Sequence, residues 1–346
     1  MSLAQVAAVV GVSVAVAAAV WGLVFSRRDY FFASDDPGVV PDNPRRASTV
    51  RLWRFDDSIK DGERLASTSP VRPAVLGLLR RSLIKPRDMA VMVVDLAVRG
   101  HVKIDEVSTG SGTDWALLWR NESSSIGGLQ GYEKKFLDAV FTDSNTVLVR
   151  NLRRGFGPKF IEVQNALYAG SVKSGLFKAN PIDEVIGFRK FGAMGIVGSI
   201  FLLGLLITDE GGWVYVALPV LAGAFALMGF STRAARRTAL GSALHIQGQR
   251  LLTFMQDGDI DGESFEELLP FAVAGGFTTG WGSRCDAADS GGPSDATGVA
   301  DAAKLSWLDS PRVGAGASCG EVASVVEGFA SSFEKMVRDS RKGNKR

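Results

Sequence analysis

The chain is poor in the residues from which active sites and metal centres are most often built. Its 346 residues include two cysteines and two histidines, and Cys285 and Cys319 form no CxxC pair and have no neighbouring histidine. This pattern predicts neither a disulfide framework nor a zinc site. We therefore expect both cysteines, together with His101 and His245, to be packed or solvated structural residues.

Catalytic signatures are missing as well. The sequence contains no evident Ser-His-Asp set, HExxH motif or pair of carboxylates at a catalytic spacing. It therefore predicts no catalytic residue, no cofactor and no metal ligand, and we do not expect the chain to be an enzyme. An enzyme whose site is assembled across several domains is the weaker alternative.

A surplus of positive charge is also absent. The formal net charge is +2 at pH 7, whereas a dedicated nucleic-acid-binding domain is expected to be strongly basic. Nucleic acid is therefore not an expected partner.

What the sequence does contain is three long runs without a charged residue, at 3–25, 191–208 and 213–230. Runs of about 18 residues or more are long enough, as helices, to cross the hydrocarbon core of a bilayer. The first charge, Arg27, comes after the first run, which favours an uncleaved anchor; a signal peptide cleaved near residues 17–19 is the alternative. The runs hold no ionisable group, which argues against an ion pathway within this chain.

Basic residues flank these runs on one side only. The loop between the second and third runs carries Asp209 and Glu210 and no cation, and the positive-inside rule then fixes the orientation. We predict a multi-pass protein of the cell (inner, plasma) membrane, with the N-terminus outside and residues 26–190 and 231–346 in the cytoplasm. The flanking cations are Arg27, Arg28, Arg189, Lys190, Arg233, Arg236 and Arg237.

Residues 72–180 are predicted to form a cytoplasmic α+β domain. Its first part reads helix, helix, glycine and β-hairpin, which is the order of a winged helix with the hairpin as its wing. The expected elements are helices 73–83, 86–99, 131–141 and 158–177 and strands 101–107, 115–120 and 147–149.

The remaining segments are predicted from composition and spacing. Residues 26–71 are expected to be a juxtamembrane linker with a short strand near Val50, and 233–282 a cytoplasmic helical region bent at Pro270. The last segments are a flexible linker at 283–318, an amphipathic helix at 319–338 and a basic tail at 339–346. Glutamates on the polar face of that amphipathic helix favour docking on protein over docking on an anionic membrane.

Several stretches together resemble one family. Residues 95–104 (DLAVRGHVKI) are similar to the "DLAxRGxxxI" segment of the YciQ-like predicted membrane proteins, a bacterial domain-of-unknown-function family, and 132–137 (YEKKFL) to its next helix. Residues 238–241 (TALG) and 265–272 (FEELLPFA), followed by Trp281, are similar to its C-terminal pattern.

The resemblance implies architecture and location only, because the family has no established enzyme chemistry. Typical members carry a large extracytoplasmic β-rich domain before the first membrane helix, whereas this chain starts at the anchor. The resemblance thus implies that the outer domain is absent or supplied by another protein.

Two loops match ligand-binding motifs in part. Residues 257–262 (DGDIDG) open like a calcium-binding loop, but the twelfth position is Leu268 instead of glutamate, so an acidic turn is the simpler interpretation. Residues 150–157 (RNLRRGFG) form a basic loop ahead of a helix and lack the phosphate-binding GxxxxGK[ST] pattern. A capped surface loop accounts for them.

We expect an uncharacterised membrane protein that presents cytoplasmic winged-helix-like modules for protein interaction or scaffolding. Its expected partners are membrane lipid and a protein that carries a separate extracytoplasmic domain. The alternative is a membrane-tethered regulator that binds nucleic acid through residues 72–180. The helix expected to enter the groove, 86–99, carries Asp88 and Asp95 beside its cations, so repulsion from phosphates argues against this alternative.

Overall fold

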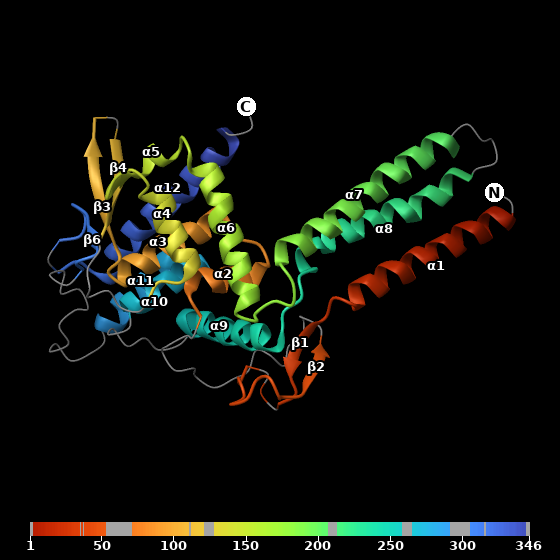
Figure 1. Cartoon of the computed structure of the whole chain (residues 1–346), viewed down its shortest axis with the longest axis horizontal. Coiled ribbons are helices and arrows are strands. Elements are labelled where there is room, and N and C mark those ends of the chain that lie inside the picture. The colour runs from red at the N-terminus through yellow and green to blue at the C-terminus, as the bar shows by residue number, and fades with distance from the viewer. Residues whose placement is uncertain are drawn as a thin grey trace. The chain divides into compact units, whose positions relative to one another are not determined.

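The computed structural model describes residues 3–34, 36, 38–52, 71–110, 112–120, 128–206, 213–257, 265–290, 305–314 and 316–343. The chain divides into two compact units (Figure 1). Unit 1 consists of Met1–Ser58, Arg81–Leu83 and Ser171–Ala243, and unit 2 of Ile59–Arg80, Ile84–Gly170 and Leu244–Arg346.

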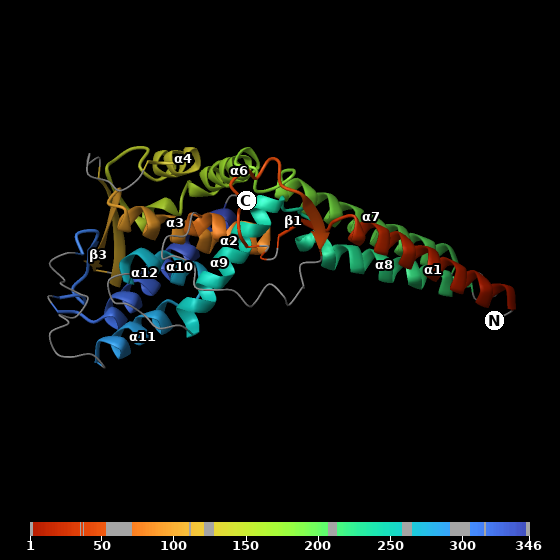
Figure 2. The same ribbon diagram turned by 90° about the horizontal axis from the view of Figure 1, so that it is seen from below.

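Unit 1 is built on three long apolar helices. They are α1 (Leu3–Phe25), α7 (Pro181–Leu206) and α8 (Ala217–Phe230), with the short 3-10 turns η2 (Trp213–Val216) and η3 (Ser231–Arg233) before and after α8. Both views show the three helices running side by side (Figures 1 and 2). By length and composition, Leu3–Phe25 and Pro181–Leu205 are able to cross a membrane, and Ala217–Arg233 forms a shorter apolar helix. The helix predicted to begin at residue 191 in fact begins at Pro181, so it includes Arg189 and Lys190.

Glycines let these helices approach closely. A Cβ atom on Gly195 of α7 would lie 2.8 Å from the Cβ atom of Ala224 on α8. A Cβ atom on Gly223 of α8 would lie 2.4 Å from a methyl carbon of Val16 on α1. Small residues at such contacts are typical of helix packing within membranes.

A two-stranded ribbon follows α1 in unit 1. Strands β1 (Asp29–Phe32) and β2 (Thr49–Leu52) pair antiparallel, with Tyr30 opposite Arg51. Phe32 is buried against Ala239 and Ala243 of α9 (Ala239–Asp257). The predicted short strand near Val50 is confirmed, but the linker around it is more ordered than expected because β1 supplies it with a partner. The rest of the predicted linker, residues 53–70, lies outside the described residues.

Unit 2 contains the predicted helix–helix–hairpin order. Helices α2 (Pro73–Arg81) and α3 (Pro86–Val98) precede the hairpin of β3 (Val102–Thr109) and β4 (Gly112–Trp119). The chain turns at Gly100, whose φ of 83° requires glycine or strain. After the hairpin come α4 (Gly131–Val140), β5 (Thr146–Leu148), α5 (Val149–Leu152) and α6 (Phe156–Lys173). The helix predicted to run to residue 177 thus ends earlier, at Lys173.

The sheet of unit 2 gains a strand from the C-terminal part of the chain. The strand order is β5-β4-β3-β6, in which β6 (Leu308–Asp309) lies parallel to β3. β6 falls within residues 283–318, which were predicted to be a flexible linker. That prediction is wrong for the described part, since Trp307 and Leu308 are also buried.

The C-terminal helices complete the core of unit 2. They are α10 (Phe265–Gly275), α11 (Thr278–Ser290) and α12 (Cys319–Gly343), and α3 packs against both α10 and α12. The boundary between two helices predicted at Pro270 lies elsewhere: α10 includes Pro270 and ends at Gly275, and Gly276, where φ is 84°, follows it before α11. The amphipathic helix predicted from residue 319 is confirmed and packs on protein, and it extends to Gly343 into the predicted basic tail. Regions 72–180 and 233–282, predicted separately, thus share one core through residues 244–282.

The two cysteines also differ from expectation. Cys285 on α11 and Cys319 at the start of α12 form a disulfide, with their Cα atoms 5.9 Å apart. Both residues are buried. The sequence offered no cue for this pairing because neither cysteine has a motif around it.

Candidate functional site

Two of the family-like segments, residues 95–104 and 132–137, meet in a buried ion cluster in unit 2. The Arg99 side chain lies 7% exposed, and its Nη2 atom donates hydrogen bonds to Asp95 Oδ2 at 2.9 Å and to Glu133 Oε1 at 2.7 Å. Asp95 and Arg99 belong to the first family-like segment, and Glu133 belongs to the second. Glu133 also accepts the backbone N–H of Gln130 at 2.7 Å, which caps the start of α4. The cluster therefore joins the end of α3 to the start of α4.

Burial shapes the protonation of this cluster. Loss of solvation raises the pKa of Asp95 above its ordinary value, the charge of Arg99 opposes the change, and Glu133 adds to it. Burial, followed by the nearby charge of Glu133, likewise raises the pKa of the Tyr132 hydroxyl far above its ordinary value. All four side chains lie within the core, so the cluster is a structural tie.

The later family-like segments are structural too. In unit 1, the hydroxyl of Thr238 accepts the backbone N–H of Gly241 at 3.1 Å and so caps the start of α9. Gly241 allows close contact with the carbonyl oxygen of Leu176, which a Cβ atom would meet at 2.0 Å. In unit 2, the rings of Phe265 and Trp281 stack with centroids 6.5 Å apart.

A second ionic tie in unit 2 was not predicted. Arg87 of α3 binds Glu327 of α12 through two hydrogen bonds of 2.9 and 2.8 Å, and its Nε atom donates to the carbonyl of Val273 at 3.0 Å. The Thr278 hydroxyl donates to Glu327 at 2.6 Å. Burial would raise the pKa of Glu327, but the hydrogen bonds from Arg87 and Thr278 outweigh it and leave the pKa below its ordinary value. This tie holds α3, α10, α11 and α12 together.

The partial motifs of the sequence do not assemble into a site. In the basic loop 150–157, Arg150 pairs with Asp114 at 3.3 Å. Gly157 allows α12 to cover the first turn of α6, since a Cβ atom there would lie 2.9 Å from the Ser340 carbonyl oxygen. The acidic turn lies outside the described residues from position 258 to position 262. Among the residues that the structure describes, no group of three or more His, Cys, Asp or Glu side chains is placed to hold a metal ion.

The helix considered for DNA recognition lies inside the core. Every residue of α3 from Asp88 to Ala97 is buried. Asp88 is used to cap its own helix, because its Oδ2 atom accepts the backbone N–H of Lys85 at 2.6 Å. A helix enclosed in this way offers no face to a DNA groove.

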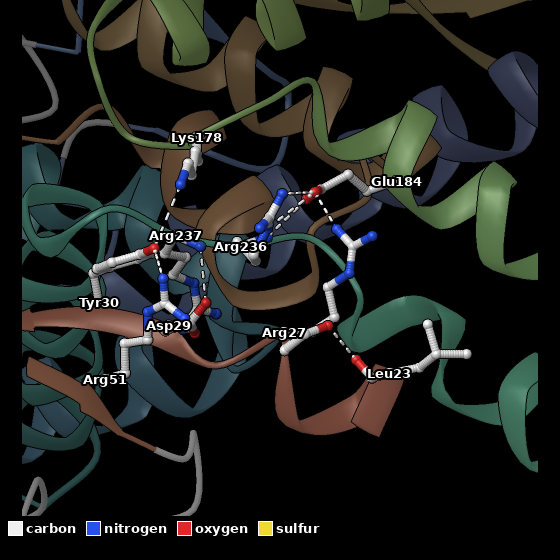
Figure 3. Close-up of polar contacts among 10 residues, drawn as sticks. Leu23, Arg27, Asp29, Tyr30, Arg51, Lys178, Glu184, Arg236 and Arg237 are labelled. Carbon is white, nitrogen blue, oxygen red and sulfur yellow. Dashed lines mark hydrogen bonds and ion pairs between the residues drawn. The ribbon is translucent and has the colours of Figure 1, made fainter. Parts of the chain in front are cut away.

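The candidate functional site is the charged junction at the basic ends of α1, α7 and α8 in unit 1 (Figure 3). Its centre is Glu184 of α7, whose side chain is 9% exposed. Glu184 forms an ion pair with Arg27, just after α1, and accepts Arg236 Nη2 at 2.9 Å and the Arg236 backbone N–H at 3.0 Å. The guanidinium of Arg27 also lies 5.0 Å from the centroid of the Phe188 ring. One carboxylate therefore joins the ends of all three helices.

The ribbon is tied to the same junction. Asp29 is fully buried and accepts the backbone N–H of Arg237 at 2.8 Å and its Nη1 atom at 3.4 Å. The Tyr30 hydroxyl accepts Arg51 Nη2 at 2.6 Å and Lys178 Nζ at 3.4 Å (Figure 3). Burial would raise the pKa of Tyr30, but the hydrogen bonds and charges of Lys178 and Arg51 leave it below its ordinary value. The sequence showed Arg27, Arg236 and Arg237 as flanking charges and gave no sign of their carboxylate partners.

Comparison with known protein families identifies a match over most of the chain. Residues 66–283, more than half of the chain, match the family described as "Predicted membrane protein (DUF2207) C-terminal domain". A search of curated proteins and a search of solved structures each find no match. The matched segment includes both helices α7 and α8 and all the family-like segments described above. The chain belongs to this family of predicted membrane proteins, whose C-terminal domain has no assigned function.

Proposed function

We propose that α1, α7 and α8 all cross the membrane and that unit 2 faces the cytoplasm as a winged-helix-like module for binding another protein. The observation that carries the proposal is the charged junction at Glu184. It gathers Arg27 and Arg236, from the flanks of two different helices, at one end of the three helices. Cations that collect at one end of a helix bundle match the positive-inside rule.

The surfaces and lengths of the helices support three spans. Phe191 and Phe201 of α7 are 69% and 68% exposed, and none of the most apolar stretch of α1 is buried. Lipid would cover this apolar surface, which water solvates poorly. The 14 residues of α8 and the 4 of η2 together reach about 29 Å, close to the roughly 30 Å of a hydrocarbon core.

Reporter fusions test the orientation. Fusions at positions 180 and 345 are expected to report the cytoplasm, and a fusion after Gly211 the opposite side. A cytoplasmic signal at Gly211 would overturn the proposal of three spans.

The hairpin of unit 2 supports the interaction role. β5 pairs only with residues 116–118 of β4, and β6 only with residues 104–105 of β3. Among the described strands, the outer part of the hairpin, including the pair Ser108 and Thr113, therefore pairs only with itself. Both residues are exposed. Free strand edges of this kind can accept a strand from a partner protein.

Photo-cross-linking tests this role in native membranes with the full chain. A cross-linking side chain at Ser108 is expected to capture one reproducible protein, whereas one at the exposed Lys135 of α4 is not. The capture should be lost with Thr113→Pro, because proline removes a backbone donor from the hairpin. Recovery of only lipid and chaperones, or equal capture at both positions, would refute the interaction role.

Nucleic-acid tethering, the alternative from the sequence, is not proposed. It would require α3 to leave the core of unit 2, where Met89 to Ala97 are buried.

A further inference from the structure

Unit 1 contains an open groove of about 620 Å³ beside the charged junction, which we call the basic groove. Four segments line it: the ribbon, the stretch between its strands, the turn between α6 and α7, and the start of α9. The lining residues used below are Tyr30, Arg45, Lys173, Lys178, Thr238 and Leu240.

The charged side chains that line the basic groove are positive. Arg45, Lys173 and Lys178 line it, and none of the aspartates and glutamates that the structure describes does. All three cations are exposed. The Nζ atom of Lys178 lies 3.4 Å from the Tyr30 hydroxyl. Like charges held around one hollow repel each other, and a bound anion relieves the repulsion.

The walls of the basic groove are fixed by the backbone. Thr238 donates its hydroxyl to the carbonyl of Gly175, and the backbone N–H of Thr238 donates to the carbonyl of Leu176 at 3.1 Å. The backbone N–H of Lys178 donates to the carbonyl of Arg236 at 3.1 Å. The Tyr30 ring is enclosed between Lys178 Nζ and the Arg51 guanidinium, at 5.4 and 4.8 Å from its centroid. Lys173, at the end of α6, and Lys178 are therefore carried on segments that are held in place before any ligand binds.

The chemistry of the lining points to phosphate. Three cations exceed what a single carboxylate neutralises, whereas a phosphate monoester carries about 1.5 to 2 negative charges at neutral pH. Lysine is a common phosphate ligand in proteins, and arginine offers paired donors to phosphate oxygens. Leu240, half-buried at the start of α9, adds an apolar side chain for the organic part of the ligand.

We propose that the basic groove binds a phosphate-bearing ligand, with Arg45, Lys173 and Lys178 holding the phosphate. The ligand has two possible sources. Tyr30 and Thr238 follow closely after α1 and α8 and Lys178 closely precedes α7, so the basic groove adjoins the helix ends and a phospholipid headgroup is one source. A soluble phosphate ester is the other. The lipid source rests on the proposed three spans, whereas phosphate binding itself does not.

Direct binding to the full chain in detergent micelles tests the proposal. The probes are dioctanoyl phosphatidic acid and glycerol 3-phosphate, which share a phosphate monoester and differ in their acyl chains. Lys173→Gln combined with Lys178→Gln is expected to weaken binding at least tenfold. Lys190→Gln, also at the basic end of the helices but outside the lining of the basic groove, is expected to leave binding within twofold.

The outcomes distinguish the two ligand sources from the absence of a phosphate site. Binding of phosphatidic acid alone, lost in the double variant, supports the proposal with lipid as the source. Binding of both probes with similar affinity, lost in the double variant, supports it with a soluble ester. No binding of either probe, or binding that the double variant and Lys190→Gln weaken equally, overturns it. An unchanged melting temperature of the double variant shows that lost binding is not lost folding, which is expected because both lysines are exposed.

Discussion

Replacing Arg99 by methionine should weaken unit 2 severely, although no open site would be touched. Methionine keeps most of the apolar stem of arginine and removes the charge that lies between Asp95 and Glu133. The two carboxylates would then face each other in the core. A second cation, Arg72, has its Nε atom 3.9 Å from Glu133 Oε1, but its side chain is 34% exposed.

The size of the effect follows from burial. The side chains of Arg99 and Glu133 are 7% and 1% exposed, so solvent cannot replace the lost partner. Removing one member of a buried ion pair costs about 3–5 kcal/mol. Glu133→Gln in the same chain should recover part of this loss, because it removes a charge that Arg99→Met leaves unpaired.

Hydrogen exchange in the full chain measures this loss locally. Amides in residues 95–104 and 131–140 should exchange roughly 100-fold faster or more in Arg99→Met, which corresponds to about 3 kcal/mol. Arg338→Met is the matched control. Arg338 is 58% exposed and pairs with Glu334, and both residues lie on α12. Its effect should stay below about 1 kcal/mol. If both variants exchange at similar rates, the Arg99 cluster does not hold α3 to α4.

Three further predictions concern protonation, the junction and the cysteines. Because burial raises the folded pKa of Asp95 above its ordinary value, its contribution to stability is present at low pH and is lost as the pH rises through the raised pKa. Asp95→Asn should therefore reduce the gain in the melting temperature of unit 2 that accompanies a fall in pH from neutrality toward that pKa, and an unchanged gain would contradict the assigned cause. Glu184→Gln should lower the melting temperature in detergent and speed proteolysis near residue 28, because it removes the negative charge that Arg27 and Arg236 share. Equal rates of proteolysis in the variant and the unmodified chain would contradict the role of Glu184 in holding the helix ends together. Under oxidising conditions the disulfide between Cys285 and Cys319 should raise the free energy of unfolding of unit 2 by about 4 kcal/mol relative to the reduced chain. Urea unfolding with and without reductant measures this difference, and equal unfolding midpoints would exclude a structural role for the disulfide.

Local patterns predicted the early elements of unit 2 well. The alternation in β3 and β4 and the glycine at position 100 are signals carried within a few residues. The proline at position 86 also marked the start of α3 correctly. Such signals need no knowledge of the rest of the chain.

Elements that depend on distant partners were missed or misjudged. β6 has two residues and is a strand only because it pairs with Ile104 and Asp105 of β3. α10 continues through Pro270, since the burial of most of its residues outweighs the loss of one backbone donor. The strand β1 was missed for the same reason, because its ordered conformation depends on β2 and α9.

The charges of the candidate site were predictable from the sequence, but the way in which they come together was not. Positive flanks were evident in sequence, but their partner Glu184 lies far from Arg27 along the chain and belongs to a helix that begins before the apolar run. The basic groove likewise combines Arg45, Lys173 and Lys178 from separate segments. No local rule relates residues that come together only through the packing of unit 1.

The family-like segments differ in whether a ligand can reach them. Arg99 and Glu133 are enclosed in the core of unit 2, and Phe265 and Trp281 are buried there as well. An enclosed ion cluster is weak support for stability, because apolar side chains of similar volume often serve as well, and it offers nothing to a ligand. Residues 238–240 instead line the basic groove, where a ligand can reach them. Of these segments, the one that begins at Thr238 is therefore the one that a ligand in the basic groove can contact.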